Sequence, residues 1–267
     1  GLEAACTAAE VGCNVFLFEK SDKLGGLSEF ISDLPGKTRM KDFPRYLRTR
    51  AERLPNLYTF LNTEASIEEI NKFHPDIVVN ATGSHPVVPP IPGLRENRAA
   101  GNLDDIFIMI NNVNAGKYPE ESCRGKKVLV MGGGAVGLDI IEYFAPLGAD
   151  CTIIDMLPTI GAVADPITKC SIKETFEVNH VKQYVNTAIQ EVKEHSIVVK
   201  TPEGNVEELE FDLGFSALGL AAYNPILDEL HKEYDDTDVD VYNIGDSVRA
   251  RHIMEGTMDG RAILNVL

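Results

Sequence analysis

Apolar residues in this sequence fall into short runs that end at glycines or at acidic residues. The clearest is Val128–Met131, a run of four apolar residues that is typical of a parallel strand buried on both faces. A glycine-rich turn and an amphipathic stretch follow it, and a second apolar run, Asp150–Asp155, ends in a carboxylate. This order predicts a strand, a turn, a helix and a second strand at the centre of the chain.

The rest of the chain shows similar patterns and indicates an α/β protein. Strands are expected at residues 14–19, 57–62, 76–83, 212–219 and 239–246, a hairpin within 192–211, and helices at 1–12, 43–54, 165–177 and 253–266. Ser66 is expected to cap a further short helix. The proline-rich stretch 85–93 excludes a helix or a central strand, so we expect a stiff crossing between domains there.

Two charged segments have a structural and a functional interpretation. Seven basic residues lie between Lys37 and Arg53. A solvated helix face is the expected account, and docking to a missing domain or to an anionic ligand is the alternative. The acidic run 233–240 is expected to be a solvated loop.

The chain contains an internal repeat at an offset of 136 residues. This offset relates Gly1 to Gly137, Gly12 to Gly148, Glu19 to Asp155, Gly25 to Gly161, Asp76 to Asp212, Ala81 to Ala217 and Gly83 to Gly219. Such a repeat predicts two copies of one fold. Because Gly1 aligns with the third glycine of the central turn, we expect the first strand and two glycines of the first copy to be missing, and the sequence to be a fragment. The alternative is that the first helix never followed a glycine loop.

The central turn has the spacing of a dinucleotide-binding motif. Gly132 allows the tight turn, Gly134 lets a pyrophosphate approach the backbone, and Gly137 lets helix and strand pack closely. The helix that follows offers free N–H groups and a positive dipole end to phosphates. Asp155 lies near the spacing expected of an acid that binds the ribose hydroxyls. A glycine-rich turn with no ligand is the alternative.

Two features of the first copy also suggest ligand contacts. Gly25 and Gly26 follow the strand that ends at Glu19 and could admit a second phosphate, although an ordinary loop is an equal alternative. Asp246 ends a strand with Gly245, at the sheet edge where ligands of parallel sheets collect. It could hold a hydroxyl-bearing ligand there, or could be a plain helix cap.

Composition narrows the classes of function. A chain of 267 residues allows about two domains, and its net charge of −16 argues against nucleic acid or anionic membranes as main partners. It has no membrane-length apolar stretch and no visible signal peptide. The five cysteines form no C-x-x-C pair, and the six histidines are dispersed, so no metal site is expected. Inert, reduced cysteines in a cytoplasmic protein are the simplest account.

These motifs together resemble the FAD/NAD(P)-binding two-domain flavoproteins of the pyridine-nucleotide-disulfide oxidoreductase superfamily. Four segments resemble one branch more closely, the C-terminal portion of the NADH:flavin oxidoreductases related to old yellow enzyme, such as 2,4-dienoyl-CoA reductase, enoate reductase and trimethylamine dehydrogenase. These segments are residues 61–64, 74–83, 91–93 and 155–158. The resemblance covers nearly the whole chain. It departs at Asp139, where the family usually has glutamate.

The resemblance implies a fold and a set of cofactor contacts. The fold is α/β with two Rossmann-like domains, the second inserted in the first: residues 1–100 and 223–267 would bind FAD, and 101–222 would bind NADH. For FAD, Glu19 would hold the ribose, Gly1, Gly25 and Gly26 the pyrophosphate, Thr82 and Gly83 a strand-end contact, and Gly245 and Asp246 the ribityl or pyrophosphate region. For NADH, Gly132, Gly134 and Gly137 would hold the pyrophosphate and Asp155 the ribose. An acid there, with no arginine in 156–161, favours NADH over NADPH.

The activity implied is hydride transfer from NADH to FAD, followed by electron transfer to a missing N-terminal barrel of the same protein. In the family that barrel carries FMN and an iron–sulfur cluster and reduces the substrate, here an enoate or enoyl-CoA type of double bond. No catalytic residue is assigned, because the cofactors carry the chemistry. A non-catalytic nucleotide-binding module is one alternative. A disulfide reductase is another, although this chain lacks the C-x-x-C pair that such chemistry requires. A homo-oligomer is left open.

Overall fold

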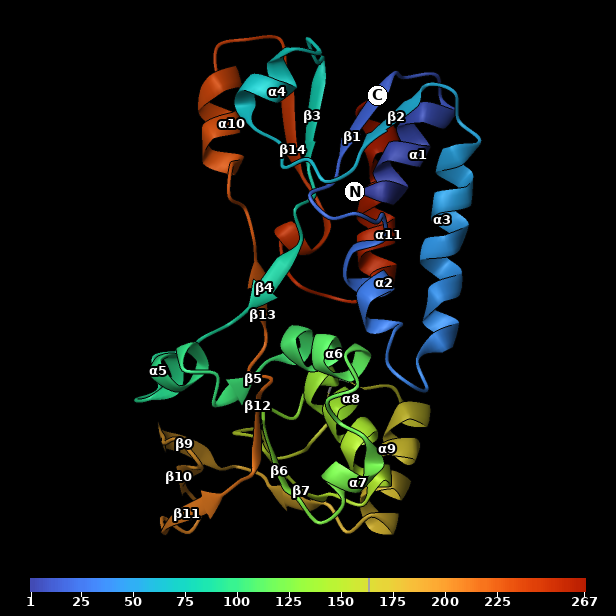
Figure 1. Ribbon diagram of the computed structural model, residues 1–267. Coiled ribbons are helices and arrows are strands. Elements are labelled where there is room, and N and C mark those ends of the chain that lie inside the picture. The colour runs from blue at the N-terminus through green and yellow to red at the C-terminus, as the bar shows by residue number, and fades with distance from the viewer. Residues whose placement is uncertain (163) are drawn as a thin grey trace. The chain divides into compact units, whose positions relative to one another are not determined.

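A computed structural model of the protein describes residues 1–162 and 164–267 (Figure 1). The chain divides into two compact units: unit 1 comprises Gly1–His85 and Leu220–Leu267, and unit 2 comprises Pro86–Gly219. The connections between them carry β4 (Ser84–Pro86) and β13 (Leu220–Ala222), which pair as a two-stranded sheet. The stretch 85–93 contains no helix and no strand beyond Pro86, which confirms the expected irregular connection.

Unit 2 is built on a five-stranded sheet in the order β5-β12-β6-β7-β8, in which all neighbours are parallel. Its strands are β5 (Leu103–Asp104), β6 (Lys127–Met131), β7 (Asp150–Ile154), β8 (Lys182–Tyr184) and β12 (Leu213–Ser216). The helices are α5 (Leu94–Ala99), α6 (Ile106–Asn114), α7 (Glu120–Cys123), α8 (Ala135–Phe144), η2 (Ala145–Leu147) and α9 (Pro166–Val178). An antiparallel sheet of β9 (Ala188–Val192), β10 (Ser196–Lys200) and β11 (Val206–Glu210) completes the unit.

The continuous apolar run of β6 is explained by burial on both faces. Val130 lies on the face of α8, close to Gly137. Leu129 and Met131 belong to the core cluster on the opposite face, which includes Ile197 of the antiparallel sheet. A strand covered on both sides has no solvent face and therefore no alternation of polar residues.

Unit 1 contains two separate pairs of parallel strands. They are β1 (Val15–Phe18) with β2 (Leu57–Phe60), and β3 (Ile77–Asn80) with β14 (Asp240–Asn243). Its helices are α1 (Leu2–Glu10), α2 (Gly26–Ile31), η1 (Thr38–Lys41), α3 (Asp42–Glu52), α4 (Ile67–Asn71), α10 (Leu227–Tyr234), η3 (Gly245–Ser247), α11 (Ile253–Ala262) and η4 (Ile263–Asn265). Helix α1 packs against both α3 and α11 (Figure 1).

A buried ionic cluster joins the three helices α1, α3 and α11. Arg50 donates to Glu3 at 2.9 Å and to both carboxylate oxygens of Glu10 at 2.6 and 2.7 Å, and Arg261 donates to Glu3 at 2.9 Å. The Glu3 side chain is only 6% exposed. Burial opposes its charge, but hydrogen bonds from Arg261 and Arg50 outweigh this and lower the pKa of Glu3. The expectation of a solvated basic face therefore holds for the exposed Arg45 and is wrong for Arg50.

The repeat found in the sequence is visible in the strands. An offset of 136 carries the bounds of β3 onto those of β12, and carries β1 onto the last four residues of β7. In unit 2, β6 lies between β12 and β7. Among the residues that the structure describes in unit 1, no strand joins the corresponding β3 and β1.

The structure confirms the predicted α/β class with a parallel sheet and differs from the predictions in detail. The hairpin expected within 192–211 is β10–β11, but β9 extends it by a strand that lies mostly before 192. The acidic run begins inside α10, which continues to Tyr234, so its first two residues are helical rather than loop. Residues 86–100 fall in unit 2, because Val88, Ile91 and Leu94 pack with its core.

Candidate functional site

The glycine turn of unit 2 is held by close backbone packing. Gly132 has φ +109°, and a Cβ there would lie 2.2 Å from the carbonyl oxygen of Ala217. A Cβ on Gly137 would lie 1.9 Å from the carbonyl oxygen of Gly132. Both positions therefore require glycine, because any side chain would push β6, β12 and α8 apart.

Asp155 fixes this turn through its side chain. One carboxylate oxygen accepts the N–H of Gly133 at 2.6 Å, and the other accepts the N–H of Leu157 at 2.8 Å. The carbonyl of Gly133 accepts the N–H of Gly161 at 2.8 Å. The structure thus brings Asp155 against the glycine turn, where the sequence spacing placed it. It adds contacts of Gly133, Leu157 and Gly161 that the motif did not reveal.

The start of α8 is open to a ligand. Gly134 is its N-cap in an extended conformation, and a Cβ there would meet nothing within 4 Å. The N–H groups of the first helical turn have no intrahelical partner. A pyrophosphate fits beside Gly134, because the approach is free and the helix end is positive. Asp155 retains acceptor capacity for ribose hydroxyls, since each carboxylate oxygen has two lone pairs.

Two of the predicted residues of unit 1, Gly1 and Glu19, lie at the ends of strands β3 and β1. A Cβ on Gly1 would contact Cβ of Ala81 at 3.4 Å, so the start of α1 lies beside the end of β3. Glu19 directly follows β1, and its carboxylate accepts both the N–H and the hydroxyl of Ser21, at 2.8 and 2.7 Å. The acid at the strand end is therefore oriented by its own loop.

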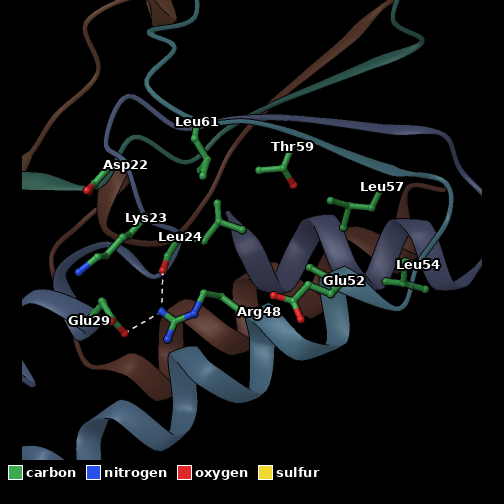
Figure 2. A pocket seen from close by; sticks show the side chains of 11 residues that line it. Asp22, Lys23, Leu24, Glu29, Arg48, Glu52, Leu54, Leu57, Thr59 and Leu61 are labelled. Carbon is green, nitrogen blue, oxygen red and sulfur yellow. Dashed lines mark hydrogen bonds and ion pairs between the residues drawn. The ribbon is translucent and has the colours of Figure 1, made fainter.

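The turn at Gly25 and Gly26 is braced by Arg48. Gly25 has φ +129°, and a Cβ there would lie 2.9 Å from Cβ of Glu29. Arg48 donates to the carbonyl of Leu24 at 2.9 Å and to Glu29 at 2.7 Å (Figure 2). Only glycine fits this turn, and a guanidinium group from α3 holds it in place.

A cavity of about 580 Å³ lies beside this turn (Figure 2). Its lining residues come from the loop after β1, from α2 and α3, and from β2: Asp22, Lys23, Leu24, Glu29, Arg48, Ala51, Glu52, Leu54, Leu57, Thr59 and Leu61. No predicted site residue lines it. We place no cofactor there, because the glycine turns and strand ends that fit a dinucleotide lie outside it.

The remaining predicted residues of unit 1 lie at the ends of β3 and β14. Thr82 donates its hydroxyl to the carbonyl of Tyr223, and the carbonyl of Gly83 accepts the N–H of Tyr223 at 2.9 Å. Gly245 donates its N–H to Asp259 at 3.1 Å, and Asp246 accepts the N–H of Arg251 at 3.1 Å. The neighbouring strands β3 and β14 therefore present these residues at one sheet edge. Their roles toward FAD stay predictions.

Three of the five cysteines, Cys6, Cys123 and Cys151, are buried, and Cys170 is exposed. All five are free. Burial raises the pKa of Cys6 to about 11 and that of Cys151 to about 12, so both remain protonated thiols near neutral pH. Among the described residues, no group of three or more His, Cys, Asp or Glu is placed to hold a metal ion. Nor does this part of the chain include a helix long and apolar enough to cross a membrane.

The fold and the glycine turn define a dinucleotide-binding α/β protein, and comparison with known proteins gives its family. A profile of the pyridine nucleotide-disulphide oxidoreductases matches residues 48–254. The chain belongs to this family of flavin-dependent oxidoreductases, whose members bind FAD and NAD(P)H.

Two curated relatives are similar along almost the whole chain. The NADH oxidase of Thermoanaerobacter brockii is 31% identical over 261 residues, which are 97% of this chain and 38% of that protein. The bilirubin reductase of Mediterraneibacter gnavus is 30% identical over 268 residues, which are 100% of this chain and 39% of that protein. The chain therefore spans about two-fifths of the length of these relatives.

A solved structure, a 2-naphthoyl-CoA reductase in complex with 2-naphthoyl-CoA, matches with a TM-score of 0.80 and 26% identity. The match covers 97% of this chain and 37% of that one. It agrees with the curated relatives in matching this chain to a part of a larger protein.

Proposed function

We propose that this chain is the nucleotide-binding portion of an NADH-dependent flavin oxidoreductase, with NADH bound to unit 2 and FAD to unit 1. The glycine turn of unit 2 carries the proposal. Gly132 and Gly137 are packed too closely for a side chain, Gly134 is open, and Asp155 is bonded to the turn. This combination suits a pyrophosphate at the start of α8 with a ribose beside Asp155.

The residues around Asp155 favour NADH over NADPH. A 2′-phosphate would meet the carboxylate of Asp155 as a like charge, and residues 156–161 contain no arginine to compensate it. Replacement Asp155→Ala is therefore expected to weaken NADH binding and to reduce the preference for NADH over NADPH. Unchanged discrimination between the two nucleotides would refute the role of Asp155.

In unit 1, this chain's residues would hold FAD at the ends of β1, β3 and β14. Glu19 would accept the ribose hydroxyls, Gly1, Gly25 and Gly26 would flank the pyrophosphate, Thr82 and Gly83 would lie along the cofactor, and Gly245 with Asp246 would hold its ribityl or pyrophosphate region. When bound, NADH would supply a hydride that FAD would accept. The protein contributes position and exclusion of water, so we assign no catalytic side chain.

The substrate-reducing site would lie outside this chain. We propose a barrel domain of the same protein, carrying FMN and an iron–sulfur cluster, that receives the electrons and reduces an enoate or enoyl-CoA type of double bond. The partial coverage of the relatives, 38% and 39% of their length, supports a further domain. The similar solved structure is a complex with 2-naphthoyl-CoA, and this acyl-CoA ligand supports the proposed class of substrate.

A second candidate function is a nucleotide-binding module without turnover. The strand pairs of unit 1 favour it, because no described strand joins them and the proposed FAD contacts are divided between two sheets. The visible spectrum of the purified chain, recorded before and after anaerobic addition of NADH, separates the two. A bound flavin that bleaches supports the oxidoreductase. A colourless protein that binds NADH contradicts it for this chain and supports the module.

A further inference from the structure

Four residues of unit 1 form a closed ring of amide hydrogen bonds next to the turn that carries Asp246. Asn80 donates both N–H bonds of its side chain, to Oδ1 of Asn224 at 2.9 Å and to Oδ1 of Asn243 at 2.8 Å. The amides of Asn224 and Asn243 both donate to the backbone carbonyl of Ser247, at 2.7 and 3.0 Å. We call Asn80, Asn224, Asn243 and Ser247 the amide ring.

Asn80 is the buried hub of the ring, whereas Asn243 is half-buried and Asn224 is exposed. Asn80 is 4% exposed and Ser247 is 0% exposed. Both side-chain N–H bonds of Asn80 are used, and its Oδ1 lies 3.3 Å from the hydroxyl of Thr82. A buried amide that lost these partners would pay its desolvation cost uncompensated, so the contacts define one arrangement of the four residues.

The ring lies at the strand ends where the proposed FAD contacts are found. Asn80 and Asn243 are opposite each other as the last residues of β3 and β14. Ser247 closes η3, which contains Asp246, and Asn80 precedes Thr82 by two residues. The hydroxyl of Ser247 also donates to the carbonyl of Ile244 at 2.6 Å. The ring therefore ties the Thr82–Gly83 end of β3 to the turn that holds Asp246.

We propose that Asn80 is a positioning residue for FAD, which acts through the Ser247 carbonyl to hold the Gly245–Ser247 turn and the carboxylate of Asp246. This inference rests on the proposed FAD site of unit 1. Asn80 does not itself contact the cofactor. An apolar pair at positions 80 and 243 would fill the same space, but would leave the Ser247 carbonyl without the Asn243 donor and Asn224 without the N–H of Asn80. The ring thus provides orientation that packing alone does not.

Two variants separate orientation from stability. Asn80→Asp is isosteric and removes both donors, so one carboxylate oxygen faces the Oδ1 atoms of both Asn224 and Asn243. The double variant Asn80→Leu/Asn243→Ala removes two members of the ring and leaves an apolar strand end, and its melting temperature measures what this costs in stability. A matched control is Asn56→Asp, because Asn56 also donates both N–H bonds of a side-chain amide, to the carbonyls of Ala9 and Cys13, at the other end of β1.

The measurement is the dissociation constant of FAD from quenching of flavin fluorescence, together with the visible circular dichroism of the bound flavin. We expect both Asn80 variants to raise this constant about tenfold, corresponding to the loss of one or two buried hydrogen bonds, and to change the dichroism. NADH affinity should stay unchanged in every variant and reports that unit 2 is folded. Asn56→Asp should lower the melting temperature and leave the FAD constant within about twofold.

Each failure has its own signature. If the unmodified chain binds NADH but no FAD, the proposed FAD site is wrong and the role of Asn80 falls with it. If the unmodified chain binds FAD and the Asn80 variants bind it equally well with the same dichroism, only the role of Asn80 is overturned. An equal loss of FAD affinity in Asn56→Asp would also overturn it, because the effect would then be general destabilisation.

Discussion

In unit 2, β6 is the central strand of a five-stranded parallel sheet and leads directly into the glycine turn. In unit 1, the corresponding strands β1 and β3 pair with β2 and β14, and no described strand connects the two pairs. The turn of unit 2 is held by backbone bonds, from Gly132 to Ile154 and from Gly161 to Gly133, and by a single side chain, Asp155, which accepts the N–H of Gly133. The proposed site of unit 1 depends instead on side chains: the Arg50 cluster, Arg48 and the amide ring. The turn of unit 2 thus combines main-chain bonds with one carboxylate, whereas the proposed site of unit 1 relies on several polar side chains.

The largest expected effect is on the ionic cluster of unit 1. Arg50→Ala leaves Glu3 buried with only Arg261 and frees Glu10, so we expect unit 1 to lose about 3 kcal/mol of stability. Hydrogen exchange of unit 1 amides measures this, with unit 2 amides as the internal reference. Arg45→Ala removes the exposed pair with Asp42 and should cost about 0.5 kcal/mol or less. Equal effects of the two variants would contradict the importance of the buried cluster.

A second experiment adds to unit 1 a strand that corresponds to β6 of unit 2. A copy of residues 127–136, placed ahead of Gly1, repeats the segment that precedes Gly137 in unit 2. We expect it to pair with β1 and β3 and to raise FAD affinity about a hundredfold, because the turn is then fixed before binding. A copy with lysine in place of two apolar residues is the control. If both extensions give the same FAD affinity, the two units do not share one binding arrangement.

The glycine turn of unit 2 allows a smaller and more selective test. Gly134→Ala adds a methyl group that meets no protein atom within 4 Å, so the fold should be unchanged. The same methyl lies where the phosphate approaches, and we expect NADH affinity to fall about tenfold by calorimetry. Gly137→Ala, by contrast, should destabilise unit 2 itself, since its Cβ would lie 1.9 Å from a carbonyl oxygen. A normal NADH affinity in Gly134→Ala would place the nucleotide elsewhere.

The smallest expected effect is the pH dependence of unit 1. Hydrogen bonds from Arg50 lower the pKa of Glu10, and those from Arg261 and Arg50 outweigh burial to lower the pKa of Glu3, in both cases below the ordinary value of 4.5. Carboxylates with a depressed folded-state pKa stabilise the fold above their unfolded pKa, and this stability is lost as the pH falls through the folded pKa. Unit 1 amides should therefore lose protection below about pH 4.5, and Arg50→Ala should show less of this loss. An identical pH profile in that variant would contradict the cause.

The sequence predicted the backbone plan better than the side-chain networks. The offset of 136 identified β1, β3, β7 and β12, because strand order and glycine spacing are local properties that a repeat preserves. The spacing predicts that Asp155 lies near the glycine turn, but it does not predict the bonds of Asp155 to Gly133 and Leu157. These bonds depend on the path of the loop 156–161. The bonds of Asn80 to Asn224 and Asn243 cross 144 and 163 residues, and no periodic pattern marks them. The burial of Arg50 is likewise not predicted from its own helix, because its partners Glu3 and Glu10 lie on α1.

Calorimetric titration of the intact chain with NADH tests the central claim, that unit 2 carries the preformed dinucleotide site. We predict one NADH per chain, weaker binding of NADPH, and a smaller difference between the two nucleotides in Asp155→Ala. Absence of NADH binding by a folded chain, or an unchanged preference in Asp155→Ala, would contradict the account.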